Sequence, residues 1–343
     1  MAIHHLHEIT EKGSWESFTP LLERGLFLQS FSQKKLYEDV GQKTWLFECP
    51  ATAGSSIRSL VTKVTAKRGT FLFLPYGPMC DSELEENSLA QFFNGLKELT
   101  RSEKASFIRI SPFWNETDAA KGILRSLGFR QAPLHMLAET LWLLDIEKPE
   151  EQLLMEMDKK HRNLIRRAEK DGVTISMSRE SESTERFIDL HWQTVERHGF
   201  TPYTKDYFRS QVREFADSGQ VQIFEAWWQG HLLASAIIMF YGQSAAYHHG
   251  ASSSIPEHRK IPASYLLQWE VIREAKKKGC KIYNFWGIAP DENPKHPFYG
   301  ITHFKTGFGG RRVDLIPCHD LVVHSKYYLN WTVEKIRKWR RGF

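Results

Sequence analysis

The sequence has few cysteines, and they follow no metal-binding pattern. Its 343 residues include four cysteines, which form no Cys-x-x-Cys pair and have the spacing of neither a zinc site nor a disulfide framework. We interpret them as buried thiols in a reducing cytoplasm; they are Cys49, Cys80, Cys280 and Cys318. The cysteine pattern therefore predicts neither a metal centre nor a fold held by disulfides.

Long apolar runs are also missing. The longest, Leu232–Tyr241, has the length and the β-branched content of a strand, and it is well short of the ~18 residues of a transmembrane helix. The first ten residues contain neither the basic region nor the apolar segment of a signal peptide. We therefore expect a cytoplasmic protein.

A strong excess of one charge is the third missing feature. The formal net charge is +5, from 46 lysines and arginines and 41 aspartates and glutamates, which is too small to predict nucleic-acid binding by itself. Hydrophobic residues make up 41% and aromatic residues 13% of the chain, which excludes a disordered protein. A length of 343 residues exceeds that of one typical core and indicates two domains.

The two halves of the sequence repeat a similar order of elements. In each half a strand pair is followed by a strand, a helix and a further strand, with a Gly-Phe pair near the end, at residues 128–129 and 307–308. This order is similar to that of the N-acetyltransferase-like (GNAT) fold. We therefore predict an α+β (mixed α/β) protein of two tandem GNAT-like domains, 1–147 and 148–316, whose C-terminal segment, 317–343, returns to the first domain.

An acetyl-coenzyme A loop is missing from both halves. Such a loop places glycines before a helix, so that backbone N–H groups can approach the phosphates closely. The matching segment in the second half, residues 257–264, contains no glycine, and Pro262 removes one backbone donor. We therefore expect no cofactor, and we assign Arg259 of this segment to substrate binding.

A basic stripe runs along the helix that is predicted over residues 149–172. Lys159, Arg162, Arg166 and Lys170 recur at spacings of three and four and therefore share one helix face. One interpretation is a solvated face at the rim of a domain. The other is a surface for RNA or substrate phosphates, because the several donors of arginine and lysine suit a phosphodiester backbone.

A loop rich in hydroxyl groups leads into the helix that is predicted over residues 204–219. Thr201, Tyr203 and Tyr207 carry hydroxyls that can orient a sugar or a diphosphate. In the alternative interpretation, Thr204 is an ordinary N-cap and Tyr207 a half-buried aromatic residue. Both interpretations stay open at this point.

Five stretches, taken in order, carry a resemblance to one protein family. They are LFLQSFSQ, TFLFLPYGP, KKHRNLIRRAEKDGV, PASYLLQWEVIREAKKKGCKIYNFWGI and HPFYGITHFKTGFGG. Through them the chain resembles the Fem family (FemABX) of aminoacyl-tRNA-dependent peptidoglycan bridge transferases, in the FemX-like form without a coiled-coil arm. The resemblance covers almost the whole chain, and that family has two GNAT-like domains without a coenzyme A loop.

The resemblance implies an aminoacyltransferase that forms an amide bond. An amino acid would pass from aminoacyl-tRNA to the side-chain amine of a peptidoglycan stem peptide, carried by UDP-MurNAc-pentapeptide or by a lipid-linked precursor, to build interpeptide bridges. The basic stripe would then hold the tRNA. Two alternatives stay open: a GNAT-like N-acyltransferase that acts on another amine with a different acyl donor, and a non-catalytic tRNA-binding or envelope scaffold protein.

The resemblance also implies roles for single residues. Phe304 and Lys305 match the Phe-Lys pair of the family's transfer site, and Lys305 is our candidate for stabilising the oxyanion of the reaction. Lys34 or Lys35 matches a lysine that reaches the nucleotide diphosphate, with a register that is uncertain by one residue. These four residues form the first group of predicted site residues.

The hydroxyl-rich loop shows both a match and a departure. Thr201 and Tyr207 match the loop that holds the same diphosphate, but Tyr203 stands where relatives can have an arginine. A bidentate phosphate clamp would then be missing, which weakens the case for the UDP-linked acceptor. Ser111 stands where relatives often have a carboxylate. Proton transfer that the substrate assists is therefore at least as good an expectation as a protein base.

The glycines that follow Lys305 have the spacing of neither a P-loop nor a dinucleotide-binding turn. We expect Gly307, Gly309 and Gly310 to form a turn or a bulge at the end of a strand, with Lys305 on that strand.

The last segment, residues 326–343, combines aromatic residues with six basic ones and is predicted to be a helix. One interpretation is peripheral contact with an anionic membrane, which would place the protein at the inner face of that membrane. The other is a helix that packs on the first domain and leaves its charges in water. For the quaternary structure we favour a monomer.

Overall fold

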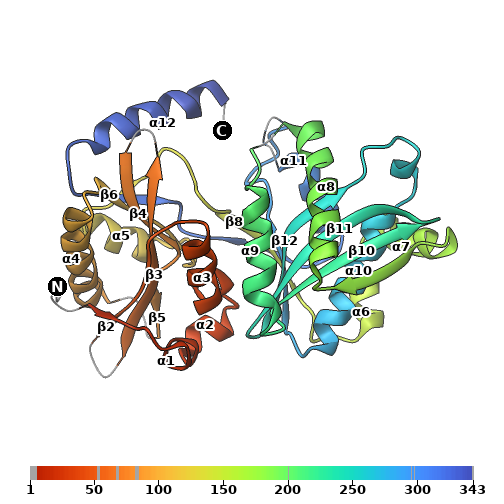
Figure 1. The fold of residues 1–343 in the computed structure, drawn as a ribbon, viewed down its shortest axis with the longest axis horizontal. Coiled ribbons are helices and arrows are strands. Elements are labelled where there is room, and N and C mark those ends of the chain that lie inside the picture. The colour runs from red at the N-terminus through yellow and green to blue at the C-terminus, as the bar shows by residue number, and fades with distance from the viewer. Residues whose placement is uncertain are drawn as a thin grey trace. The chain divides into compact units, whose positions relative to one another are not determined.

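The computed structural model (Figure 1) describes residues 6–51, 55–66, 69–81, 85–199, 201–294, 296 and 298–341. The chain forms two compact units. Unit 1 comprises Met1–Leu141, Ala289–Tyr299 and Val313–Phe343, and unit 2 comprises Trp142–Ile288 and Gly300–Arg312. The chain therefore leaves unit 1 and later returns to it, so that the red and the blue parts of the ribbon share this unit (Figure 1).

Unit 1 is built on a mixed sheet with the strand order β1-β2-β3-β4-β6-β15-β7, and β5 pairs with β3. Strands β4 and β6 are parallel and pair from Leu72 opposite Ile108 to Tyr76 opposite Pro112. The strands are β1 His7–Glu8, β2 Thr44–Pro50, β3 Ser56–Ala66, β4 Gly69–Tyr76, β5 Met79–Cys80, β6 Phe107–Pro112, β7 Arg130–Gln131 and β15 His319–Val322. The helices are α1 Lys12–Glu16, α2 Thr19–Glu23, η1 Phe27–Gln29, α3 Phe31–Asp39, α4 Glu86–Ser102, α5 Asp118–Ser126 and α12 Tyr327–Arg341.

The alternation of side chains along β4 and β6 divides the core of unit 1 into two layers. Leu72 and Leu74 point to one face, where they join the buried residues of α4 and α5. Phe71 and Phe73 point to the other face and pack with Phe107 and with Tyr327 of α12. Both faces of the sheet are therefore covered, one of them by the C-terminal helix.

A buried ionic network fixes α12 to the sheet of unit 1. The Arg109 guanidinium, which is 1% exposed, donates to both carboxylate oxygens of Asp320 at 2.7 and 2.8 Å and to both of Glu334 at 3.0 and 2.8 Å. The Tyr327 hydroxyl donates to Asp320 at 3.1 Å. Arg109 lies on β6, Asp320 on β15 and Glu334 on α12. The predicted return of the C-terminal helix to the first domain is confirmed.

Unit 2 contains a second mixed sheet with the order β14-β8-β13-β12-β11-β10-β9. Helix α10 packs on it through the buried residues Leu267, Val271 and Ala275, spaced by four as the sequence predicts. The strands are β8 Thr140–Asp145, β9 Thr174–Ser178, β10 Val221–Trp228, β11 His231–Tyr241, β12 Ser244–Ser252, β13 Ile282–Gly287 and β14 Arg311–Asp314. The helices are α6 Glu150–Glu156, α7 Lys159–Lys170, α8 Ser181–His198, α9 Lys205–Ala216, η3 His258–Lys260, α10 Ala263–Lys277 and α11 Tyr299–Thr306.

Two neighbouring strands of unit 2 separate partway along their length. The parallel pairing of β12 with β13 runs from Ser244 opposite Ile282 to Ala246 opposite Asn284, and both strands continue beyond it. On its other side β12 pairs with β11, and His248 is inserted there as a bulge between paired residues. The bulge and the end of the pairing fall at the same point of β12. The result is the splayed central strand that the GNAT-like order of elements predicts.

The segment around Lys305 differs from the prediction. We expected Lys305 on a strand, but residues Tyr299–Thr306 form the helix α11. Phe304 of this helix and Phe308, just beyond its end, pack together toward the core of unit 2. Gly309 and Gly310 have φ angles of +83° and +105° and connect α11 to β14. A turn is thus present, but it follows a helix and precedes a strand.

Among the described residues, no helix has both the length and the apolar composition that a membrane span requires.

Candidate active site in unit 2

Lys305 is a buried cation at the end of the splayed strands. Its side chain belongs to a residue that is 5% exposed, and its Nζ donates a hydrogen bond to the carbonyl of Gly287, the last residue of β13, at 2.5 Å. The amine also lies 5.9 Å from the centre of the Tyr247 ring on β12. Burial lowers the pKa of Lys305 to about 7. An amine with this pKa changes between its charged and neutral forms near neutral pH, whereas an exposed lysine stays charged there.

The residues of β12 at the splay are uncharged. Tyr247 and His248 are half-buried, and the His248 ring packs edge-on against Trp286 of β13 at 4.9 Å between ring centres. Burial raises the pKa of Tyr247 to about 12 and lowers the pKa of His248 to about 3. Both side chains are therefore neutral near pH 7, and Lys305 is the residue of this group whose charge can change there.

The backbone at the end of β13 is bent so that a carbonyl faces Lys305. Trp286 has a φ angle of +68°, which is uncommon for a residue other than glycine, and its backbone N–H donates to Oδ1 of Asn284 at 2.8 Å. Residues in such strained conformations concentrate at functional sites. The bend explains why the Gly287 carbonyl is available to Lys305 rather than to a neighbouring strand.

His161 of α7 contacts α11 and the turn that follows it, beside Lys305. Its Nε2 donates to the carbonyl of Phe304 at 3.0 Å, and its ring packs edge-on against Tyr265 and Phe308 at 4.9 Å between centres in each case. A Cβ on Gly307 would overlap this ring. Gly307 is therefore needed so that the imidazole can reach the backbone beside Lys305. His161 was not among the predicted site residues. Its sequence position offers one indication, because His161 lies on the helix face opposite the basic stripe, where buried residues are expected.

Phe304 packs with the aromatic residues around His161, and its side chain has no polar group to offer to a substrate. Its half-buried ring lies 5.1 Å from Tyr265 and 5.5 Å from Phe308, measured between centres. Through the carbonyl of Phe304, α11 receives the hydrogen bond from His161. The geometry therefore gives Phe304 a part in positioning Lys305.

The predicted basic stripe lies on one face of α7, opposite the buried residues His161, Ile165 and Ala168. Three of its members, Lys159, Arg166 and Lys170, are exposed. Arg162 is half-buried and donates from Nη1 to the carbonyls of Leu154, Met155 and Met157 at 3.0, 3.0 and 2.6 Å. These carbonyls belong to the C-terminal end of α6, so Arg162 caps that helix. The structure therefore separates Arg162 from the three solvent-facing cations.

The hydroxyl-rich loop holds two stacked tyrosines. The rings of Tyr203 and Tyr207 lie 4.2 Å apart between centres, with Tyr207 buried and Tyr203 47% exposed. Thr204 caps α9, because its Oγ1 accepts a hydrogen bond from the backbone N–H of Tyr207 at 3.2 Å. Thr201 is exposed. The N-cap interpretation of Thr204 is confirmed, and one ring face of Tyr203 is turned to solvent.

The remaining predicted site residues lie on elements other than α11. Lys34 and Lys35 lie on α3 of unit 1, where Nζ of Lys34 pairs with Glu38 at 2.5 Å and Lys35 is exposed. Arg259 is an exposed residue of η3 in unit 2. Its positive charge adds to burial in lowering the pKa of Arg197. Each of these cations is at or near the surface of its own unit.

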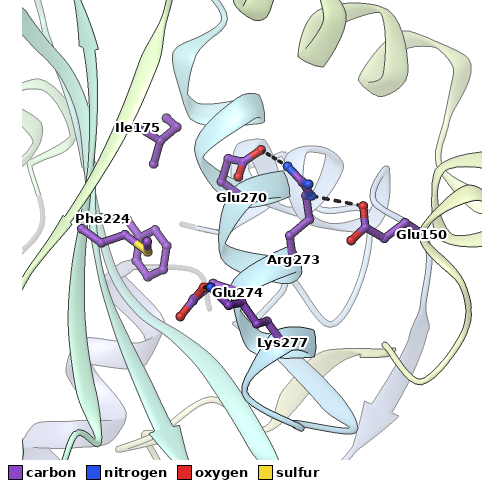
Figure 2. A pocket seen from close by; sticks show the side chains of 8 residues that line it. Glu150, Ile175, Phe224, Glu270, Arg273, Glu274 and Lys277 are labelled. Atoms are coloured by element: carbon purple, nitrogen blue, oxygen red, sulfur yellow. Dashed lines mark hydrogen bonds and ion pairs between the residues drawn. The ribbon is translucent and has the colours of Figure 1, made fainter.

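A surface pocket of about 440 Å³ opens elsewhere in unit 2 (Figure 2). Arg273 crosses it and bonds Glu270 at 2.9 Å and Glu150 at 3.1 Å, as the dashed lines in Figure 2 show. Lys305 does not line this pocket. The described residues also contain no group of three or more His, Cys, Asp or Glu side chains that could hold a metal ion. We therefore place the candidate site at Lys305 and the splayed strands.

Comparisons with known proteins agree with the fold. The profile of the FemAB family matches residues 10–126, and that of the acetyltransferase (GNAT) domain matches residues 156–305, which end at Lys305. A lipid II:glycine glycyltransferase of Staphylococcus aureus (strain USA300) is 23% identical over 78% of this chain and 81% of its own length.

Two solved structures support the same architecture. The crystal structure of FemX has a TM-score of 0.81 at 19% identity and covers 96% of this chain and 99% of its own. A tandem GNAT protein from the clavulanic acid biosynthesis pathway has a TM-score of 0.51 at 10% identity and covers 82% and 83%. These matches confirm the predicted tandem GNAT-like fold. Together these matches support a member of the Fem family and an amide-forming aminoacyltransferase.

Proposed function

We propose that the protein transfers an amino acid from aminoacyl-tRNA to the side-chain amine of a peptidoglycan stem peptide. The observation that carries the proposal is the buried amine of Lys305 at the splay of β12 and β13. A relative named lipid II:glycine glycyltransferase favours an acceptor on a lipid-linked precursor over UDP-MurNAc-pentapeptide. The product would be an interpeptide bridge of the cell wall.

The acyl donor is an ester, and the chain offers no coenzyme A loop at the matching place. Residues 257–264 contain no glycine, and they form the short helix η3 followed by Pro262, which has no N–H to offer to a phosphate. An aminoacyl ester is already activated, so the reaction needs no covalent enzyme intermediate. Positioning of the two substrates and stabilisation of charge are sufficient.

In the proposed step, the acceptor amine attacks the ester carbonyl carbon. A C–N bond forms, the C–O bond to the ribose breaks, and the amine proton moves to the departing ribose oxygen. Lys305 stabilises the oxyanion of the tetrahedral intermediate through Nζ. Because burial has lowered its pKa to about 7, a negative charge that develops beside it draws a proton onto the amine. The cation is thus formed where the transition state needs it.

The same environment helps the acceptor. A free lysine-type amine has a pKa of about 10.4 and is almost fully protonated at neutral pH, so it cannot attack. A substrate amine that loses its hydration beside Lys305 would have its pKa lowered for the same reason. A substrate amine that loses its proton in this way can react, which removes the need for a carboxylate base where Ser111 stands in the other unit.

We assign the donor and acceptor contacts to the predicted cations and hydroxyls outside α11. Lys159, Arg166 and Lys170 are proposed to bind the phosphates of tRNA, since they project to solvent from one face of α7. Arg162 supports this surface by capping α6. The proposed contacts of the acceptor precursor are Lys34, Lys35, Thr201, Tyr203, Tyr207 and Arg259. We further propose that the enzyme works as a monomer on the cytoplasmic side.

The experiment combines the purified protein with tRNA that carries a labelled amino acid and with each acceptor in turn. We expect label on the lipid-linked or UDP-linked muropeptide and no transfer from an acyl-coenzyme A. Transfer from acyl-coenzyme A alone would replace the proposal by a GNAT-like acyltransferase. Binding of tRNA without turnover on any acceptor would leave a binding protein. Lys277, an exposed lysine of α10, supplies the matched control for each substitution of Lys305.

A further inference from the structure

Helix α12 uses one of its faces to dock on unit 1. Tyr327, Asn330 and Glu334 recur at spacings of three and four and are buried. Glu334 accepts hydrogen bonds from Arg109 of the sheet and from Nδ2 of Asn330 at 3.0 Å. The most buried part of this face is polar, and its hydrogen bonds fix how the helix lies on unit 1. The other side of the helix takes no part in these hydrogen bonds.

The opposite face of α12 is apolar and exposed. Tyr328, Ile336 and Trp339 follow each other at spacings of eight and three and lie on one side of the helix, with Leu329 beside them. Their exposed fractions are 48%, 46%, 82% and, for Leu329, 64%. We call these four residues the apolar stripe of α12. A surface helix normally turns its apolar side to the core, whereas here that side faces solvent.

Helical spacing places Lys335 and Arg340 at the two borders of the apolar stripe, and Arg337 and Lys338 nearer the docked face. Lys335, Arg337, Lys338 and Arg340 are exposed in the last turns of α12. The acid of this helix is Glu334, and it is buried against Arg109. The described outer surface of the helix therefore carries positive charge beside apolar side chains, which is the composition of helices that lie in the interface of an anionic membrane.

We propose that α12 is a membrane-interface helix, which inserts its apolar stripe into the headgroup region of an anionic phospholipid surface while its other face stays docked on unit 1. Leu329 and Ile336 carry no polar group that could bond a phosphate or a base, but they would add buried apolar area in a lipid interface. Trp339 has an apolar ring with a polar N–H, which suits the boundary between lipid and water. The apolar stripe and the docked face are opposite, so the helix binds without leaving unit 1.

The inference rests on the proposed function in one respect. If the acceptor is lipid-linked, a membrane-interface helix brings the enzyme to the surface that holds it. Vesicle binding itself requires no substrate, so the two ideas can fail separately.

The test is flotation of the full-length protein with vesicles of phosphatidylglycerol and phosphatidylcholine, compared with vesicles of phosphatidylcholine alone. We expect binding to the anionic vesicles that weakens as salt is added. The double variant Ile336→Ser/Trp339→Ser should lower the partition coefficient by at least about tenfold, because each side chain loses apolar area in the interface. Met155→Ser removes a 79% exposed apolar side chain from α6 and should change nothing.

Each outcome decides the proposal. Equal binding of wild type and the double variant, or no binding to anionic vesicles, overturns it. If tRNA displaces the vesicles and the double variant also loses tRNA binding, the surface belongs to RNA and the proposal is wrong. With a lipid-linked acceptor in vesicles the double variant should transfer slowly, and with soluble UDP-linked acceptor it should match wild type. If the wild-type protein transfers the amino acid to the lipid-linked acceptor but does not float with vesicles, the proposed function is supported and the membrane-interface role of α12 is refuted.

Discussion

The buried amine of Lys305 should make the folded protein less stable at neutral pH than a neutral side chain would. Its pKa falls from an ordinary 10.5 to about 7 in the folded chain. Between these values the unfolded state binds more protons than the folded state, so stability rises with pH across this window. At about pH 7 the penalty amounts to about 4 kcal/mol, and at about pH 9.5 it has fallen to about 1 kcal/mol.

The perturbation that exposes this penalty is Lys305→Met, which keeps the length of the side chain and removes the charge. The substitution also removes the hydrogen bond to the Gly287 carbonyl, which costs about 1 kcal/mol. We therefore expect the variant to be more stable than wild type by about 3 kcal/mol at about pH 7 and to be equal to it at about pH 9.5. A catalytic group that lowers stability in this way is expected of an active site.

The assay is urea-induced unfolding of both proteins, followed by tryptophan fluorescence at the two pH values. Lys277→Met, at an exposed lysine of α10, serves as the control and should follow wild type at both. Parallel pH dependence of wild type and Lys305→Met would refute the reasoning, because it would mean that Lys305 keeps an ordinary pKa in the folded protein.

Three further predictions concern the support of the site and of the fold. Gly307→Ala should destabilise unit 2 by about 2 kcal/mol or more, since its Cβ would overlap the His161 ring, and a double-mutant cycle with His161→Ala should show that the two penalties are not additive. Arg109→Leu should cost about 3–5 kcal/mol in urea unfolding, because it leaves two buried carboxylates without their partner. Arg166→Gln together with Lys170→Gln should weaken tRNA binding and reduce its salt dependence; filter binding at several salt concentrations measures both, and an unchanged slope would remove α7 from the tRNA surface.

Single strands and helices can be predicted from the sequence because each depends on residues that are close together in the chain. The short apolar runs of β4 and β6 and the i,i+4 spacing of apolar residues in α10 predict the strands and the helix that the structure contains. Lys305 was found through the resemblance to the Fem family, not from its spacing. Its burial could not be predicted, since an isolated lysine in a sequence is an exposed residue in most proteins.

The rest of the site depends on contacts between distant segments. The splay of β12 and β13 and the bulge at His248 arise from strand pairing, which no local pattern records. The contact of His161 with the backbone of Phe304 joins residues that are 143 positions apart. Arg162 was placed in a phosphate-binding stripe by its spacing, whereas the carbonyls it caps belong to the preceding helix. Lys305 was expected on a strand, whereas it lies in the helix Tyr299–Thr306, beside the buried contact of Phe304 with Phe308.

The central claim is that Lys305 at the splayed strands carries the transfer of an amino acid from tRNA. Its most direct test is the single-turnover rate with charged tRNA and a lipid-linked acceptor, measured for wild type, Lys305→Ala and the control Lys277→Ala. We predict that the loss of Nζ lowers the rate by about 10²–10³-fold, as for the removal of one oxyanion donor, and that the control equals wild type. A rate for Lys305→Ala within a few-fold of wild type would contradict the account.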